Sequence, residues 1–231
     1  MGSNLDKSGN HDAAITAFLE KVKQTPAPVL AGNRGRLIFA LDATMSRQPT
    51  WDRACKLQAE MFSETKAIGG LDVQLVFFRG HNEFSAGKWV NDADALSRQM
   101  TGIQCRGGFT KIGRVLDHAA AEAGQARTLV FVGDACEEDV DALCASAGKL
   151  ALLGMKAFLF HEGQNRRARW AFQEIARITG GAYCPFDASS PQQLRDLLRA
   201  VAAYAAGGKR ALAALTSRTG RDVQLLIEQL R

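Results

Sequence analysis

Short apolar segments of strand length alternate with amphipathic segments along most of the chain. The strong apolar segments lie at residues 36–41, 73–78, 128–132 and 156–160, a short one lies at residues 181–186, and a weaker pair lies at residues 83–84 and 88–90. The first of them lacks the alternation of polar and apolar positions seen in a half-exposed strand, which predicts a strand covered on both faces. The other strong segments and the short one are predicted to be strands of the same sheet, and the weaker pair an antiparallel edge strand.

The amphipathic segments are predicted to be helices. They cover residues 12–23, 50–68, 92–99, 137–152, 167–179 and 191–205, a further helix opens at Thr110, and helical periodicity continues over residues 209–231. Strands that alternate with helices of this length pair in parallel through crossover helices. The sequence therefore predicts an open, doubly wound, Rossmann-like α/β sheet, mostly parallel and flanked by helices. It divides the chain into an N-terminal helix and linker (1–35), the α/β domain (36–206) and a C-terminal helical extension (207–231).

Composition and charge narrow the class of protein. Hydrophobic residues make up 46% of the chain and charged residues 23%, as is usual for a soluble globular protein. The net charge of +5 is spread over scattered Lys and Arg residues, and aromatic residues are only 7%, which argues against a nucleic-acid partner. The absence of a long apolar segment, of a signal peptide and of CxxC pairs predicts a cytoplasmic protein with reduced thiols and no membrane partner.

Polar side chains lie at the boundaries of three predicted elements, at one edge of the predicted sheet. In an open α/β sheet, ligands bind outside the carboxyl ends of the strands. Asp42, Thr44 and Ser46 follow the first strand on alternate residues, Asp134 follows the middle strand, and Thr110 stands at the start of a helix. These five side chains offer two carboxylates and three hydroxyls.

Oxygen atoms of this kind are the ligands that Mg²⁺ prefers, and Mg²⁺ retains water where the protein offers no further ligand. Two carboxylates and three neutral hydroxyls leave such a cation electrophilic, so that it favours one more anionic oxygen. The sequence therefore predicts a Mg²⁺ site, which Mn²⁺ also fits, and the added ligand would be an Asp or Glu side chain of a partner protein.

Each of these residues also has an ordinary structural interpretation. Thr110 alone is typical of a helix N-cap, Ser46 of a loop hydroxyl, and Asp134 of a cap for the helix that begins near Glu137. Asp42 is harder to explain in this way, because a charge at the end of a buried strand needs a partner.

The three motifs, taken together and in this order, resemble the metal-ion-dependent adhesion site (MIDAS) of von Willebrand factor type A (VWA) domains. The Asp-x-Ser-x-Ser motif of that family reads Asp42-Ala43-Thr44-Met45-Ser46, with Thr44 retaining the hydroxyl in place of the first Ser. The resemblance covers about residues 36–204. It implies a VWA fold, the metal ligands Asp42, Thr44, Ser46, Thr110 and Asp134, and metal-dependent binding of a protein. For the intracellular bacterial members it implies an adaptor role, so a component of an ATPase complex is one candidate partner.

Two other classes of function remain open. Asp42 could be the nucleophile of a Mg²⁺-dependent phosphotransfer or phosphohydrolase enzyme, but the haloacid dehalogenase phosphatases have a second Asp where Thr44 stands, and no Walker loop is present. A metal-free scaffold is the third possibility. His161 ends a strand at the same edge, and packing is its default interpretation. The acidic residues at 137–141 are interpreted as favourable charge in the first turns of a helix. No catalytic constellation is identified, so the sequence predicts a protein that is not an enzyme.

Overall fold

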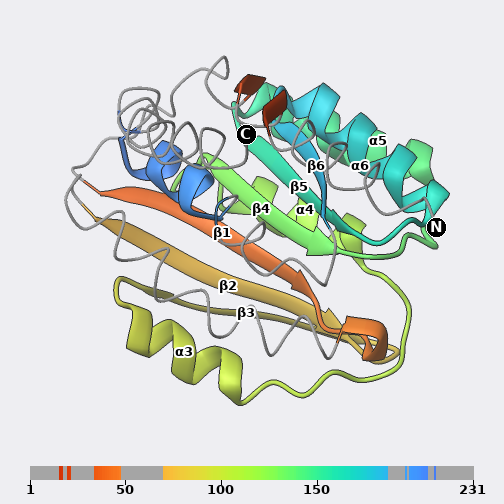
Figure 1. The fold of residues 1–231 in the computed structure, drawn as a ribbon, viewed down its shortest axis with the longest axis horizontal. Helices are drawn as coiled ribbons and strands as arrows, with labels where there is room; N and C mark the ends of the chain where they lie inside the picture. Colours follow the sequence, from red (N-terminus) through yellow and green to blue (C-terminus); the bar gives the residue numbers. More distant parts are fainter. Residues whose placement is uncertain are drawn as a thin grey trace, which may run out of the picture.

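A six-stranded mixed sheet forms the centre of the protein (Figure 1). The computed structural model describes residues 16–17, 20–21, 34–47, 70–186, 196, 198–207 and 211. The strands are β1 (Gly35–Asp42), β2 (Leu71–Arg79), β3 (Glu83–Val90), β4 (Thr128–Gly133), β5 (Lys156–Glu162) and β6 (Ala182–Phe186). Their order across the sheet is β3-β2-β1-β4-β5-β6, and every pair is parallel except β2 with β3. The doubly wound, mostly parallel sheet predicted from the sequence is thus confirmed.

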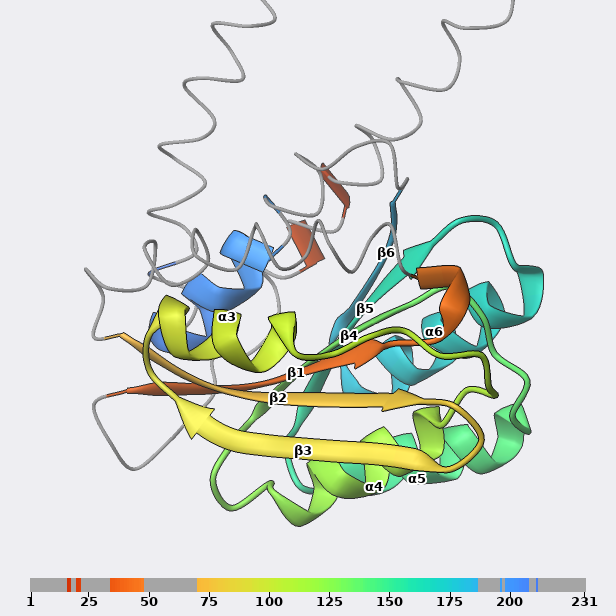
Figure 2. The same ribbon diagram turned by 90° about the horizontal axis from the view of Figure 1, so that it is seen from below.

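Helices cover both faces of this sheet, as the view in Figure 2 shows. The helices are the 3-10 turn η1 (Met45–Arg47), α3 (Ala93–Thr101), α4 (Ile112–Ala121), α5 (Val140–Leu152) and α6 (Arg166–Thr179). Helix α3 and the helical residues 198–207 pack on one face around Phe39 and Phe158, while α4, α5 and α6 pack on the other around Phe131. Two hydrophobic layers therefore enclose the strands.

The burial of the strands explains why the apolar segments lack alternation. In β1 every residue except Arg36 is buried, because helices cover both of its faces. Strand β3 lies at the edge of the sheet, where every one of its residues is half-buried or exposed. It pairs with β2 in antiparallel orientation. The predicted edge strand is confirmed as one continuous element.

The strand order places a topological switch point beside β1. The chain leaves β1 for β2 on one side and returns to β4 on the other, so the crossover connections diverge between β1 and β4. Such divergence opens a crevice at the carboxyl ends of the two strands, which is where open α/β sheets bind ligands. Asp42 ends β1, and Asp134 directly follows β4.

Several helix boundaries differ from those predicted. The helix expected from residue 137 begins at Val140, where Asp139 is the N-cap and accepts a hydrogen bond from the Ala142 amide at 2.9 Å. The helix expected to open at Thr110 begins at Ile112. The expected helix at 50–68 lies outside the described residues, as do most of residues 12–23 and of the tail from 209. The division at residues 35 and 207 therefore stays a prediction.

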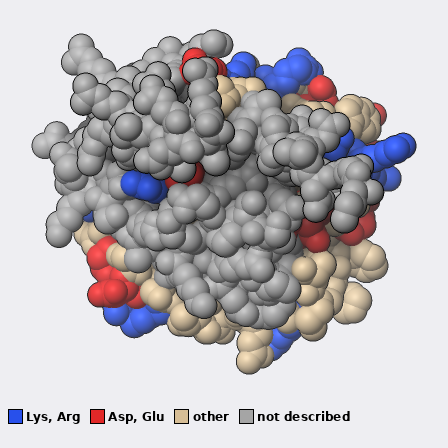
Figure 3. Space-filling view, viewed as in Figure 1, with Lys and Arg blue, Asp and Glu red and all other residues tan. Residues whose placement is uncertain are grey.

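Two surface properties complete the description. Within the described ranges, no helix is both long and apolar enough to cross a membrane. On the face shown in Figure 3, the described Lys and Arg side chains are interspersed with Asp and Glu side chains. This distribution agrees with the scattered basic residues of the sequence.

Candidate functional site

The loop after β1 brings three of the five predicted ligands together. The Asp42 side chain is 1% exposed, and its Oδ1 accepts a hydrogen bond from the Thr44 amide at 2.8 Å. This bond turns the chain sharply after the strand, as Asp side chains do when they accept from an amide two residues on. The hydroxyls of Thr44 and Ser46 then lie 3.3 Å apart. One carboxylate and two hydroxyls thus belong to a single short turn that leads into η1.

Asp134 lies at the end of the neighbouring strand. Leu41 of β1 pairs with Val132 of β4 in parallel register. Asp42 comes one residue after Leu41 and Asp134 two residues after Val132, so the two residues lie at adjacent strand ends. The Oδ1 atom of Asp134 is buried, and no described residue forms a hydrogen bond with it. Because α5 has its own N-cap in Asp139, the helix-cap interpretation of Asp134 is wrong. A buried carboxylate oxygen without a donor is costly unless a cation compensates for it.

Thr110 approaches this edge from the loop before α4. It is 5% exposed, and its Oγ1 accepts a hydrogen bond from the Glu137 amide at 3.2 Å. It is not the N-cap of α4, because the helix begins two residues later and Lys111 occupies the cap position without a side-chain hydrogen bond. The contact instead joins the Thr110 loop to the segment that follows Asp134.

Two of the acidic residues that follow Asp134, Glu137 and Glu138, bind the loop that carries Thr110. Glu137 Oε2 accepts from the Thr110 amide at 2.9 Å, and the two carboxylate oxygens of Glu138 accept from the Ile112 and Gly113 amides at 2.5 and 3.0 Å. These amides form the N-terminus of α4, where negative charge is favourable. The expected acid–helix interaction is therefore present, but Glu137 and Glu138 stabilise a different helix from the one predicted. The two consecutive acids after the β4 segment were the only signal for this role in the sequence.

Backbone hydrogen bonds attach the loop before Thr110 to the ends of β1 and β2. The Arg106 amide donates to the Ala43 carbonyl at 3.0 Å, and the Gly80 amide donates to the Arg106 carbonyl at 3.3 Å. At Gly108 the loop passes so close to the backbone of Gly80 that an added Cβ would lie 2.0 Å from its carbonyl oxygen. Close backbone approach of this kind requires glycine.

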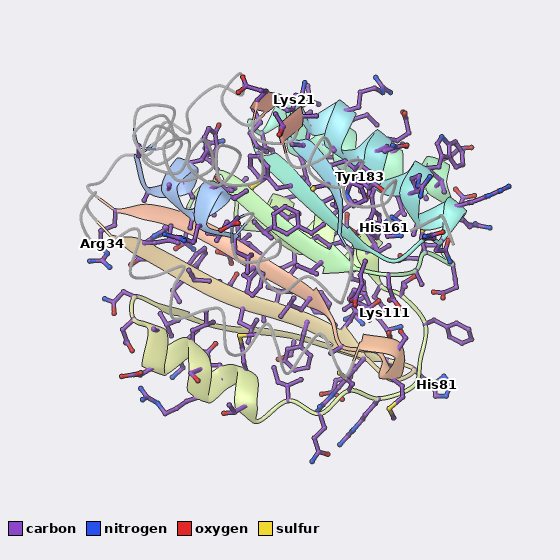
Figure 4. The ribbon with its side chains drawn as sticks, viewed as in Figure 1. Lys21, Arg34, His81, Lys111, His161 and Tyr183 are labelled. Carbon is purple, nitrogen blue, oxygen red and sulfur yellow. The ribbon has the colours of Figure 1, made fainter. Side chains whose placement is uncertain are left out.

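His161 is a packing residue at the end of β5. It is fully buried, its Nδ1 lies 3.0 Å from the Tyr183 hydroxyl, and its ring meets Phe172 edge-on at a centroid distance of 5.4 Å. Burial raises the pKa of Tyr183 above its ordinary value. Figure 4 shows the two labelled side chains close together, His161 on β5 and Tyr183 on β6. The packing interpretation of His161 agrees with this environment.

The donor atoms at the edge of the sheet fit a hard divalent cation. The set consists of the carboxylates of Asp42 and Asp134 and the hydroxyls of Thr44, Ser46 and Thr110, and all five are oxygen donors. The described part of the chain contains no cluster of three or more His, Cys, Asp or Glu side chains suited to a metal ion. A metal here would therefore depend on hydroxyls and water as well as carboxylates, which suits Mg²⁺ or Mn²⁺. The buried Oδ1 of Asp134, which has no donor among the described residues, is the feature of this structure that favours such an ion.

Comparisons with known proteins establish the fold. No family model and no curated protein matches the sequence. Among solved structures, the VWA domain of SpRpn10 matches with a TM-score of 0.58 and 15% identity, over 75% of this chain and 98% of that domain. The human COPII-coat protein Sec24c matches with a TM-score of 0.56 and 13% identity, over 76% of this chain and 32% of that protein.

Proximal thread matrix protein 1 from the mussel byssus, in a structure with a zinc-occupied MIDAS motif, is a third similar structure. It matches with a TM-score of 0.57 and 12% identity, over 76% of this chain and 48% of that protein. Identities at this level establish a shared fold and nothing finer. The protein therefore has a VWA-type α/β fold.

Proposed function

We propose that this VWA-fold protein is a non-catalytic, cytoplasmic interaction module. It binds Mg²⁺ or Mn²⁺ through Asp42, Thr44, Ser46, Thr110 and Asp134, and it captures an Asp or Glu side chain of a protein partner. When bound, the cation supplies the positive charge that attracts the partner carboxylate. The five side chains would hold the cation at the carboxyl ends of β1 and β4.

The observation that carries this proposal is the buried Oδ1 of Asp134, which has no hydrogen-bond donor among the described residues. Asp134 follows the strand next to the one that ends in Asp42, so two carboxylates lie at adjacent strand ends. Asp42 is buried and Asp134 is half-buried. Like charges in such a position repel each other, and a cation between them removes the repulsion. A zinc-occupied MIDAS motif in a protein of similar fold supports the choice of a divalent metal.

The composition of the site favours binding over catalysis. In the phosphatases considered above, a second carboxylate two residues after the nucleophile acts as the acid or base. Here that position is Thr44, which is 8% exposed and lies 3.3 Å from the Ser46 hydroxyl. A hydroxyl cannot exchange a proton near neutral pH as a carboxylate does. Asp42 therefore lacks the proton-transfer partner of that reaction.

Thermal unfolding of the metal-free protein, with and without added MgCl₂, tests the metal site. A cation at a hundred times its Kd stabilises the folded state by about 2.7 kcal/mol. We expect Mg²⁺ to raise the Tm of the unmodified chain and not that of Asp134→Asn. The same variant should equal or exceed the unmodified chain in Tm when metal is absent, because it removes one of two neighbouring negative charges. Asp94→Asn, at an exposed acid in the first turn of α3, is the matched control and should keep the full Mg²⁺ effect.

Other results would contradict the proposal. If Asp134→Asn lowers the Tm equally with and without Mg²⁺, the carboxylate has a structural role and the metal site is wrong. Metal-dependent hydrolysis of p-nitrophenyl phosphate that disappears in Asp42→Asn would favour the phosphohydrolase instead. If the Tm of the unmodified chain does not respond to Mg²⁺ or Mn²⁺, the metal-free scaffold is the better description.

Partner binding is tested by affinity capture with the full chain as bait. Components of ATPase complexes are the first candidates, following the resemblance to intracellular bacterial VWA proteins. A true partner should be retained in Mg²⁺, released by a chelator and absent when Asp134→Asn is the bait. A partner retained equally under all three conditions would show that binding does not use the metal.

A further inference from the structure

Two large apolar side chains are exposed directly beside the proposed metal ligands. Met45 is 59% exposed and stands between Thr44 and Ser46, and Phe109 is 60% exposed and precedes Thr110. Single exposed apolar residues are common, but here each one adjoins a metal-binding motif. Methionine and aromatic residues are also enriched in protein interfaces. Their position suggests that a ligand of the metal site would contact them.

The backbone around Phe109 is anchored. The loop is bound to β1 through the Ala43 carbonyl and to the β2–β3 turn through the Gly80 amide. The Phe109 ring lies beside the ring of His81 from that turn, at a centroid distance of 6.1 Å. Figure 4 shows His81 and Lys111 at the end of the sheet where η1 lies. The side chain is thus presented from an ordered scaffold, which lowers the entropic cost of binding.

The loop that carries Phe109 is basic. No Asp or Glu occurs between Asp94 and Asp117, while Arg106, Lys111 and Arg114 lie within that span. The Arg106 side chain is 61% exposed, although its guanidinium lies 3.6 Å from a carboxylate oxygen of Glu83. Two acids also lie against this loop, because the carboxylates of Glu137 and Glu138 accept from its amides. The attraction for an acidic partner therefore rests on the exposed Arg106 together with the proposed cation.

We propose that Met45 and Phe109 form an apolar docking surface for an acidic peptide segment in a partner protein. In that segment the Asp or Glu that reaches the metal adjoins a large apolar residue, which contacts Phe109 and Met45. The exposed Arg106 attracts the remaining negative charge of the segment. This inference rests on the proposed function, because the carboxylate of the segment binds through the metal.

The test is a selection of random displayed peptides on the immobilised full chain in Mg²⁺, with elution by EDTA. The selected peptides should carry an Asp or Glu next to a large apolar residue. The most enriched peptide is then synthesised and its Kd measured for the unmodified chain and for variants. Phe109→Ser should weaken binding at least tenfold, the usual effect of removing an aromatic anchor. Phe109→Leu should recover most of that affinity.

The control is Leu152→Ser, since Leu152 is 92% exposed at the far end of α5 from this site. It should leave the peptide Kd within twofold, and neither it nor Phe109→Ser should change the Mg²⁺ effect on Tm. Acidic peptides without an adjacent apolar residue, or an unchanged Kd in Phe109→Ser and Met45→Ser, would overturn the docking surface and leave the metal site intact. A Mg²⁺ effect on Tm without EDTA-eluted peptides would reject carboxylate capture itself. Mg²⁺-dependent dimers in sedimentation that are lost in Phe109→Ser would identify a second copy of this chain as the occupant and reject the peptide partner.

Discussion

Thr110 and Glu137 form a reciprocal pair of hydrogen bonds between two loops that lie 27 residues apart in sequence. The Thr110 amide donates to the Glu137 carboxylate, and the Glu137 amide donates to the Thr110 hydroxyl. The arrangement resembles a capping box, but it joins two different segments rather than the ends of one helical turn. It holds the Thr110 hydroxyl beside the segment that begins with Asp134. The position of one proposed ligand therefore depends on a residue that binds no metal in our proposal.

Replacement of Glu137 tests this dependence. Glu137→Ala should lower the free energy of unfolding by about 1 kcal/mol, because the Thr110 amide loses a charged acceptor. It should also weaken Mg²⁺ affinity, measured by titration of the Tm against MgCl₂ concentration. Glu137→Gln keeps an acceptor oxygen and should recover most of both properties. Equal Mg²⁺ affinity in all three proteins would show that the Thr110 hydroxyl does not need this support.

Glu138 should contribute to stability without acting on the metal. Its two oxygens accept from the first amides of α4, and Glu138→Ala leaves those donors without their charged partner. We expect a loss of about 1–2 kcal/mol in the free energy of unfolding, measured with urea. Asp141→Ala, an exposed acid in the first turn of α5, should cost much less. If the two variants are equally stable, the contacts of Glu138 with α4 contribute little.

The residues of β1 illustrate why the fold was predictable from the sequence. Leu37, Ile38 and Phe39 are consecutive and apolar, and each is fully buried because the sheet is covered on both faces. The same local argument identified the other parallel strands and placed Asp42 at a strand end. These features depend on neighbouring residues in the sequence, so periodicity reveals them.

The start of α4 illustrates what the sequence could not reveal. Thr110 has the residue type of an N-cap, yet the helix begins later, at Ile112. Glu138, 26 residues after Ile112, supplies the acceptors for the first amides of the helix. Contacts over such a distance follow from the order of the strands and not from local propensity. The exposure of Phe109 could not be predicted either. Whether an apolar side chain in a loop is buried depends on which other segments pack against that loop, and the local sequence does not reveal them.

Gly108 should be indispensable, whereas its neighbour Gly107 should not. A Cβ at Gly108 would overlap the Gly80 backbone, but a Cβ at Gly107 meets no atom within 4 Å. Gly108→Ala should therefore displace the loop and lower stability by about 1–3 kcal/mol, the usual cost of overpacking. It should also reduce the Mg²⁺ effect on Tm, because Thr110 lies two residues away. Gly107→Ala is the matched control and should preserve both properties. A harmless Gly108→Ala would mean that the loop adjusts without affecting the site.

His118 should make the protein less stable in mild acid. The Gln74 side chain donates to the Gly87 carbonyl, so its oxygen accepts from His118 Nε2 at 2.9 Å, and Phe84 packs against the imidazole ring. Burial lowers the pKa of His118 below its ordinary 6.5, although the nearby carboxylate of Glu122 acts in the opposite direction. The unfolded chain then binds a proton at a higher pH than the folded chain does. The contribution of neutral His118 to the free energy of unfolding is fully present above about pH 6.5. It is lost as the pH drops towards the pKa of His118 in the folded chain.

His118→Gln offers a direct measurement of this effect. Glutamine can still donate to Gln74, but it does not titrate. We expect urea unfolding at pH 7.5 to give similar stabilities for the two proteins, apart from any difference in packing against Phe84. As the pH is lowered from 6.5 to 5, the unmodified chain should lose more stability than the variant does. Parallel losses over this range would show that His118 titrates alike in the folded and unfolded states, and that other groups cause the acid sensitivity.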